Sequence, residues 1–243
     1  MTIWAIGDIH ASRVDPTTGL PEKPMDVFGP KWSNHVKRIE AAWQTSVADG
    51  DTVILAGDLD WALHLEDALP TLDMIDQWKG HKLLIRGNHD YWWSSKATAK
   101  VRCALPRSMR LIHNDAVEVE GFNVVGAKGS PVPGGMDWTD VEAKLLNRES
   151  ERLKLSLAQR NPDLPSICAL HYPPFYPCSS DTPYTRLMEE ANVYLCVYGH
   201  LHGDASAGGP AGVHEGIRYR LVAADHLDFR PVPVARQGRI VEA

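Results

Sequence analysis

Short apolar runs recur along the chain, each bounded by glycine, proline or polar residues, as is typical of buried β-strands. Five such runs stand out, at residues 2–7, 52–56, 82–85, 167–170 and 193–198. Weaker strand-like pieces occur at residues 110–113, 117–127 (with a turn at Glu120-Gly121), 217–223 and the final valines. This pattern predicts a first half in which strands alternate with other elements, followed by antiparallel-looking segments.

Between the strand-like runs, apolar residues recur every three or four positions, which predicts helices. Asn34 is the expected N-cap of the first helix, and Thr139 with Glu142 forms a capping-box pattern for a long one. Asp60 is expected to cap a helix that Pro70 interrupts before a second short helix begins. The predicted helices cover residues 34–48, 60–70, 72–78, 94–104 and 139–160.

The alternation of strands and helices predicts an α/β fold in which helices cover a mixed sheet system. No internal repeat and no strong linker divides the sequence, so we expect a single domain over residues 1–243. The stretch from Ala11 to Trp32 is rich in proline and glycine and has no apolar period. Long irregular loops in compact domains are often functional, so this stretch is either a lid over a site or a solvated insertion.

Composition narrows the class of protein. The formal net charge of −6 and the pI near 6.0 argue against a general nucleic-acid binder, although a local basic patch is compatible with both. The four cysteines form no C-x-x-C pair, and there is neither an apolar leader segment nor an uncharged stretch long enough to span a bilayer. We therefore expect a cytoplasmic protein without a membrane partner.

Ligand-type residues follow each of the five main strand-like runs. They are Asp8 and His10, Asp58, Asn88 within Gly87-Asn88-His89-Asp90, His171, and His200 and His202 within Gly199-His200-Leu201-His202. Loops at strand ends of α/β folds are the usual place for sites. Four imidazoles, two carboxylates and one amide are too many for one zinc ion and suit two metals that share a carboxylate. The absence of thiolates favours manganese, iron or zinc.

These ordered motifs, Asp8-x-His10, Gly57-Asp58, Gly87-Asn88-His89-Asp90, His171 and Gly199-His200-x-His202, resemble those of the calcineurin-like metallophosphoesterases. The resemblance covers residues 7–202. It implies a four-layer αββα sandwich of two mixed β-sheets flanked by helices. It also implies that two divalent metal ions bind at the strand ends.

The resemblance also implies roles for single residues. One metal is expected to bind Asp8, His10 and His202, and the other Asn88, His171 and His200, with Asp58 bridging the two. Family members use a metal-bound hydroxide for in-line attack on phosphorus, which makes His89 the expected general acid for the leaving oxygen and Asp90 the residue that orients His89. General chemistry agrees with these roles. Two cations can neutralise the charge that builds on a phosphoryl group, and an imidazole can protonate the leaving alkoxide.

The predicted activity is hydrolysis of a small-molecule phosphoester, favoured as a phosphodiester. The alternatives are a phosphomonoesterase (a small-molecule or phosphoprotein phosphatase), a nuclease of the same fold and a non-catalytic metal-fold interaction module. Phosphoprotein phosphatases carry a phosphate-clamping arginine soon after the motif that matches Gly57-Asp58, where this chain reads Leu59-Asp60-Trp61. An acidic chain disfavours a nuclease, and His89 disfavours a module without catalysis.

Several residues near the motifs have two interpretations. Arg86 either contacts phosphate or pairs with a nearby carboxylate. Tyr91, Trp92 and Trp93 follow the site directly, and they either stack a substrate ring or pack in the core. The histidines outside the motifs are expected to be ordinary core or surface residues, with His35 and His226 the two to reconsider if a lid reaches the metals: His35, His64, His81, His113, His214 and His226.

Overall fold

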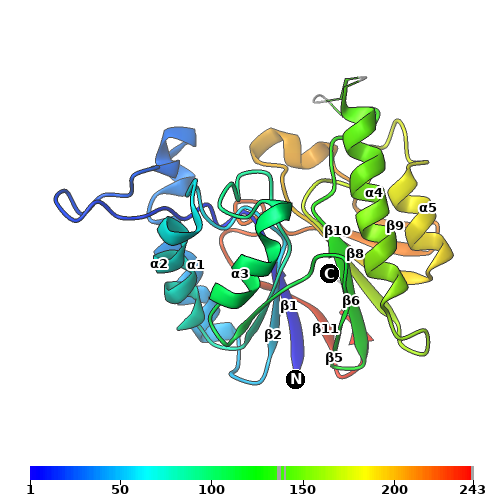
Figure 1. Ribbon diagram of the computed structural model, residues 1–243, viewed down its shortest axis with the longest axis horizontal. Helices are drawn as coiled ribbons and strands as arrows, with labels where there is room; N and C mark the ends of the chain where they lie inside the picture. The colour runs from blue at the N-terminus through cyan, green and yellow to red at the C-terminus, as the bar shows by residue number, and fades with distance from the viewer. Residues whose placement is uncertain (136–137, 140, 242–243) are drawn as a thin grey trace.

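Two six-stranded β-sheets pack against each other in the computed structural model, and helices cover the outer face of each (Figure 1). The structure describes residues 1–135, 138–139 and 141–241. The order of the first sheet is β12 (Arg239–Ile240), β11 (Val232–Arg236), β1 (Thr2–Ile6), β2 (Thr52–Leu55), β3 (His81–Leu84) and β4 (Met109–Leu111). Strands β1 to β4 are parallel, whereas β11 and β12 complete the sheet antiparallel.

The second sheet also contains four adjacent parallel strands, but it has an antiparallel strand at each edge. Its order is β5 (Val117–Val119), β6 (Phe122–Ala127), β7 (Ser166–Leu170), β8 (Val193–Tyr198), β10 (Ile217–Leu221) and β9 (Gly212–His214). The predicted αββα sandwich of two mixed sheets is confirmed.

Three apolar clusters account for the layers. The first sheet packs on α1 (His35–Ser46), α2 (Leu65–Asp76) and α3 (Thr98–Ala104), and the second on α4 (Glu142–Ala158) and α5 (Pro183–Glu190). A third cluster, which includes Ile54 and Ile167, joins the inner faces of the two sheets. Because the central strands are covered on both faces, their residues are apolar in continuous runs rather than in alternation.

Short 3₁₀ segments fill several connections: η1 (Met25–Phe28), η2 (Pro30–Trp32), η3 (Ser95–Ala97) and η4 (Gly203–Gly208). Asn34 is the N-cap residue of α1, as predicted, although its backbone is left-handed and its side chain makes no capping hydrogen bond. The predicted capping box is wrong, because α4 begins at Glu142 after Val141, and the Thr139 carbonyl accepts the Glu142 N–H. Backbone geometry therefore replaces the expected side-chain hydrogen bonds at both helix starts.

The predicted break at Pro70 is also wrong, because α2 runs through it as one helix that begins at Leu65 rather than near Asp60. Pro70 is exposed, and the Glu66 carbonyl that would accept its missing N–H is on an exposed residue as well, so water can replace the lost hydrogen bond. Asp60 is buried instead, and it accepts hydrogen bonds from the Thr71 hydroxyl (2.5 Å) and the Ala62 N–H (2.6 Å).

We expect Pro70→Ala to stabilise the protein, because it restores one helical hydrogen bond at an exposed position. The gain should be about 1 kcal/mol, since the greater freedom of the unfolded alanine chain opposes part of it. Urea unfolding followed by far-ultraviolet circular dichroism measures the change, with the exposed helix residue Glu66→Ala as a comparison. A lower unfolding midpoint for Pro70→Ala would show that the proline ring fits this helix without loss.

Candidate metal centre

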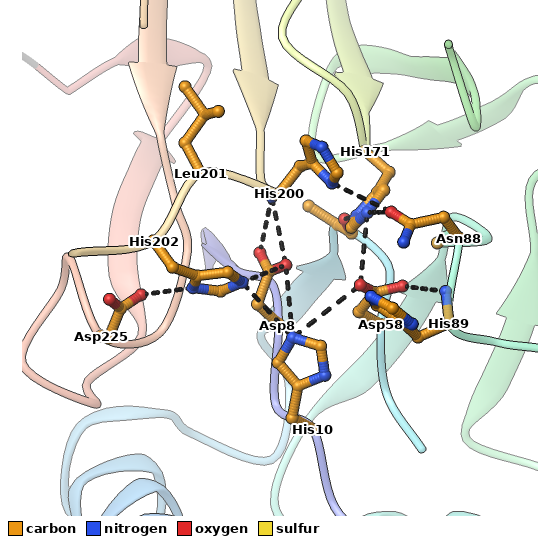
Figure 2. Close-up of polar contacts among 12 residues, drawn as sticks. Asp8, His10, Asp58, Asn88, His89, His171, His200, Leu201, His202 and Asp225 are labelled. Carbon is orange, nitrogen blue, oxygen red and sulfur yellow. Dashed lines mark hydrogen bonds and ion pairs between the residues drawn. The ribbon is translucent and has the colours of Figure 1, made fainter. Parts of the chain in front are cut away.

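The parallel strands of both sheets end at one common edge, and the predicted ligands meet there (Figure 2). Asp8 and His10 follow β1, Asp58 follows β2 and Asn88 follows β3, while His171 follows β7 and the two histidines 200 and 202 follow β8. The site therefore lies where the two sheets face each other, and each sheet supplies part of it.

One group of donors consists of Asp8, His10 and His202, whose ligand atoms lie within 4.8 Å of one another. The His202 Nε2 atom is 3.3 Å from Asp8 Oδ1 and 3.3 Å from His10 Nε2. These are the three residues expected at the first metal.

A second group combines Asp8, Asp58 and His171 within the same distance. Asn88 adjoins it, because its Oδ1 is 2.6 Å from His171 Nε2 and 2.9 Å from His200 Nδ1. The three residues expected at the second metal therefore share contacts through a single amide oxygen.

Asp58 lies between the two groups. Its Oδ2 is 3.8 Å from His10 Nε2 and 3.4 Å from His171 Nε2, while its Oδ1 accepts the backbone N–H of His89 at 2.8 Å. A carboxylate oxygen that faces an imidazole of each group has the placement a bridging ligand needs. Asp8 is also close to both groups, a proximity that the sequence alone did not indicate.

Four of these ligands have a left-handed backbone, which non-glycine residues rarely adopt. The φ angles are 58° at Asp8, 48° at His10, 54° at Asp58 and 74° at His200. Each such conformation costs of order 1 kcal/mol or more and persists only where surrounding contacts impose it. The turns therefore hold the ligand side chains at a cost in stability, as functional sites often do.

Two glycines allow the strand-end loops to approach each other. A Cβ on Gly87 would lie 2.0 Å from Asp58 Oδ1, and one on Gly199 would lie 2.3 Å from Asp8 Oδ2. Any side chain at either position would displace a carboxylate. The glycines in the two motifs are therefore explained by the space that the carboxylates occupy.

Hydrogen bonds outside the site orient two of its rings. The Nδ1 of His171 is 3.0 Å from the Ala56 carbonyl, so it carries the proton and leaves Nε2 as the ligand atom. The Nδ1 of His202 is 2.7 Å from Asp225 Oδ1, whose other oxygen accepts the Gly203 N–H at 2.9 Å. Sequence reasoning missed Asp225, although it follows the end of β10 as the other acids follow their strands.

Burial and mutual charge set the protonation of the ligands. Burial lowers the pKa of His10 and of His171, which keeps both imidazoles neutral. Burial, together with Asp90 and Asp8, raises the pKa of Asp58. Burial opposes protonation of His202 too, but Asp8 and Asp225 outweigh it and raise its pKa to about 10.

The donor set fits divalent metal ions. Asp8 and Asp58 are 0% and 1% exposed, and neither forms an ion pair with a lysine or arginine among the residues that the structure describes. Two buried carboxylates without a cationic side chain are costly unless another cation neutralises them. Carboxylate, imidazole and amide donors without thiolate suit manganese, iron or zinc.

His89 lies beside this centre rather than in either donor group. Its Nδ1 is 3.0 Å from the Tyr91 hydroxyl, and its ring packs against Trp61 with the centroids 4.2 Å apart. His10 stacks on the same Trp61 ring, with the ring centroids 4.9 Å apart. Burial lowers the pKa of His89.

The expectation that Asp90 directly orients the His89 ring is wrong. The Asp90 oxygens accept backbone N–H groups, from Gly87 at 2.7 Å, Leu59 at 2.9 Å, Asp58 at 3.0 Å and Asp60 at 3.4 Å. The Asp90 carboxylate is fully buried and its oxygens accept backbone N–H groups. The hydrogen-bond partner of the His89 ring is instead the Tyr91 hydroxyl. Burial raises the pKa of Asp90, and the four N–H donors oppose that rise.

The loop between Ala11 and Trp32 reaches the site with its last residue. Trp32 is buried, and its ring meets the edges of His10 at 6.0 Å and His202 at 5.6 Å. The two ring nitrogens of His35 lie within hydrogen-bond distance of the Trp32 and His10 carbonyl oxygens. His35 therefore supports the loop and is not placed as a metal ligand. His226 is exposed, as the ordinary interpretation predicts.

The aromatic residues after the motif divide between core and surface. Trp92 and Trp93 are buried in the core of the first sheet, which confirms the packing interpretation for both. Tyr91 is 47% exposed and forms a hydrogen bond with His89.

No helix among the described residues is both long and apolar enough to cross a membrane.

Comparison with known proteins agrees with this geometry. The phosphopantetheinyl hydrolase from Mycobacterium tuberculosis is 13% identical, with a TM-score of 0.59 over 100% of this chain and 98% of that one. Protein AQ665 of unknown function from Aquifex aeolicus is 15% identical, with a TM-score of 0.52 over 96% of this chain and 95% of its own. At these identities the likeness concerns the fold alone. The search of curated proteins found no match.

The family model described as calcineurin-like phosphoesterase matches residues 1–204, a span that contains all seven expected metal ligands and His89. Together with the two-sheet fold and the donor groups at its strand ends, this match means that the chain belongs to the calcineurin-like phosphoesterase family.

Proposed function

We propose that the protein is a dinuclear metal-dependent phosphoesterase that hydrolyses a small-molecule phosphodiester. The observation that carries the proposal is the placement of Asp58 Oδ2 between His10 and His171, which belong to the two donor groups. One metal would be held by Asp8, His10 and His202. The other would be held by Asn88, His171 and His200, with Asp58 shared between them.

When bound, the two metals would supply Lewis acidity to the phosphoryl oxygens and lower the pKa of water. His89 serves as the general acid. Its Nδ1 is engaged by Tyr91, which leaves Nε2 as the ring atom that can give a proton to the leaving oxygen. Trp61 packs against the same ring, with the two ring planes tilted by 46°. Asp90 acts through the backbone of Asp58 and Gly87, and so it positions the ligands rather than the acid.

A diester is favoured over a monoester by what surrounds the acid. The region after Asp58, where phosphoprotein phosphatases have a clamping arginine, reads Leu59-Asp60-Trp61 in this chain. Trp61, which packs against His89, also lines a cavity of about 270 Å³. Arg13, Asp60 and Asp67 are among the residues that line it. Such a cavity has space for an organic group on the phosphorus, and the fold's likeness to a phosphopantetheinyl hydrolase supports an organic phosphoester. A phosphomonoesterase remains the alternative.

The proposal includes a reducing cytoplasm and no nucleic-acid substrate. The net charge of −6 supports the second point, because nucleic-acid binders are generally basic. The first is supported by the cysteine pattern of the sequence, which has four cysteines and no C-x-x-C pair, with Cys168 and Cys196 buried as small apolar residues.

Elemental analysis of the purified protein loaded with Mn²⁺ should find two ions per chain. Asp58→Asn should lower the occupancy of both sites together, because this carboxylate faces ligands of each. Asp225→Asn is the matched comparison, since His202 is the one expected metal ligand that Asp225 contacts among the described residues, and its loss should weaken one site first. One ion in the wild type, or the loss of a single ion in Asp58→Asn, would contradict the bridging role.

Metal binding near pH 7 should release protons, because His202 with a pKa of about 10 is protonated in the metal-free protein and must be neutral to bind. Because metal binding displaces protons, metal affinity should rise with pH, and activity should fall as the solution is acidified. A pH indicator in weakly buffered solution measures the release. His202→Gln should release about one proton fewer per chain, whereas equal release would show that this histidine is neutral before binding.

His89→Asn should retain both metals and slow hydrolysis of an alkyl phosphodiester about 10²–10⁴-fold, the usual effect of losing a positioned acid. The deficit should shrink for a nitrophenyl ester, whose leaving group hardly needs a proton. Tyr91→Phe should show a smaller deficit with the same dependence on the leaving group, since it removes only the bond to Nδ1.

Asn88→Ala is the control for this experiment, because it removes a ligand next to the acid and should release metal. If His89→Asn loses metal as Asn88→Ala does, or if its deficit is the same for both leaving groups while chemistry limits the rate, the acid role is refuted.

A further inference from the structure

A cluster of four cations lies beside the metal centre, in a chain whose net charge is −6. Arg86 follows β3, Lys128 follows β6, and Arg148 and Arg152 are on α4, all near the fully buried Glu149. The charges of Arg148, Arg152 and Glu149 act on both Arg86 and Lys128. We call these four residues the basic cluster.

Only one carboxylate pairs with the basic cluster among the residues that the structure describes. Glu149 Oε1 is 2.5 Å from Arg152 Nη1 and 3.4 Å from Arg148 Nε. Arg86 and Lys128 have no carboxylate oxygen within 4.0 Å in that part of the chain, although both are partly buried. Asp90 attracts Arg86 from further away, but its oxygens are occupied by backbone N–H groups.

One polar atom of the basic cluster, Nε of Arg86, and one of the adjacent Glu149, Oε2, lack hydrogen-bond partners, and both are buried. Burying a donor without a partner is unfavourable, so native proteins rarely leave a buried donor unpaired. The Arg86 guanidinium is thus short of an acceptor at a position close to the metal ligands.

The cluster adjoins the ligands of the second metal group. The Lys128 carbonyl accepts the His171 N–H at 3.0 Å, and the Lys128 ammonium lies 4.9 Å from the centre of the Tyr172 ring. That ring packs against His200 at 4.1 Å. Arg86 stands two residues before Asn88. The strand-end edge that presents the metal ligands therefore continues into the basic cluster.

A purely structural role, attaching α4 to the rest of the fold, explains only part of the basic cluster. Arg152 is sufficient for this attachment, because it pairs with Glu149 and also donates to the Ser95 hydroxyl at 2.7 Å. Arg148, which is 61% exposed, adds little to that attachment. Arg86 and Lys128 take no ion-pairing part in it. Four cations around the single carboxylate of Glu149 repel one another at a partly buried position, and a further anion would relieve that repulsion.

We propose that Arg86, Lys128 and Arg148 bind a second anionic group, a phosphate or carboxylate, carried by the same substrate whose ester is cleaved at the metals. This inference rests on the proposed phosphoesterase function and names its substrate class, a phosphoester with a further negative charge. Guanidinium groups match the oxygens of phosphate and carboxylate, and the ammonium of Lys128 adds a point charge.

Two p-nitrophenyl esters test the proposal on the Mn²⁺-loaded protein: thymidine 5′-(p-nitrophenyl phosphate), and the same compound with an added 3′-phosphate. The wild type should have the higher kcat/KM for the phosphorylated ester, chiefly through a lower KM. In Arg148→Gln the ratio of the two kcat/KM values should fall about 10-fold, the usual effect of losing one charge-assisted contact. Lys128→Gln should lower the ratio as well.

Lys154→Gln is the matched control, because Lys154 is an equally exposed cation on α4 that faces Glu151 and lies outside the cluster. It should leave the ratio unchanged. If Arg148→Gln and Lys128→Gln slow both esters equally, or leave the ratio as in the wild type, the anion site is refuted. Thermal unfolding of each variant separates a loss of fold from a loss of selectivity.

Binding measurements distinguish failure of this inference from failure of the proposed function. Calorimetry compares thymidine 3′,5′-bisphosphate with thymidine 5′-monophosphate on the wild type and on Arg148→Gln. If the wild type hydrolyses neither ester but binds the bisphosphate more tightly, and Arg148→Gln removes that preference, the anion site stands while the phosphodiesterase proposal fails. Equal affinity for the two nucleotides in the wild type would overturn the anion site itself.

Discussion

The carboxylate of Asp90 is the contact on which the metal centre most depends. It is fully buried and accepts N–H groups from Gly87 of its own loop and from Asp58, Leu59 and Asp60 of the neighbouring one. A short loop after β2 and another after β3 are thereby fixed relative to each other. Buried backbone donors need partners, and here one side chain satisfies four of them.

The ligands themselves oppose folding. Asp8 and Asp58 are buried acids close to each other, and four ligands have a left-handed backbone. Two sheets joined by an apolar layer, with helices covering the outside, provide the stability that holds this arrangement together. A bound metal would remove part of the cost by neutralising the carboxylates. The fold thus holds two carboxylates at the strand ends, and their negative charge favours the binding of cations there.

The site has different neighbours on its two sides, because each sheet brings its own strand-end loops to it. On one side Trp61, Tyr91 and Trp32 surround His89 and His10 with aromatic rings. On the side of His171, the next strand end brings Lys128, and α4 adds further cations. The candidate metal centre thus lies between aromatic side chains on one side and the basic cluster on the other.

The sequence by itself determined the order of the strands along the chain and which polar residues end them, because continuous apolar runs and the motifs after them are local patterns. These patterns were enough to predict an α/β fold with helices covering a mixed sheet system, and the resemblance of the motifs to those of the calcineurin-like metallophosphoesterases implied the two-sheet sandwich. The motifs themselves are seven ligand-type residues at strand ends, namely Asp8, His10, Asp58, Asn88, His171, His200 and His202. Only the tertiary structure decided that Asp90 bonds the backbone, that Tyr91 and Asp225 support His89 and His202, and that α2 passes through Pro70. These contacts join residues whose proximity depends on turn geometry, solvent exposure or the packing of distant segments, none of which has a period or spacing in the sequence.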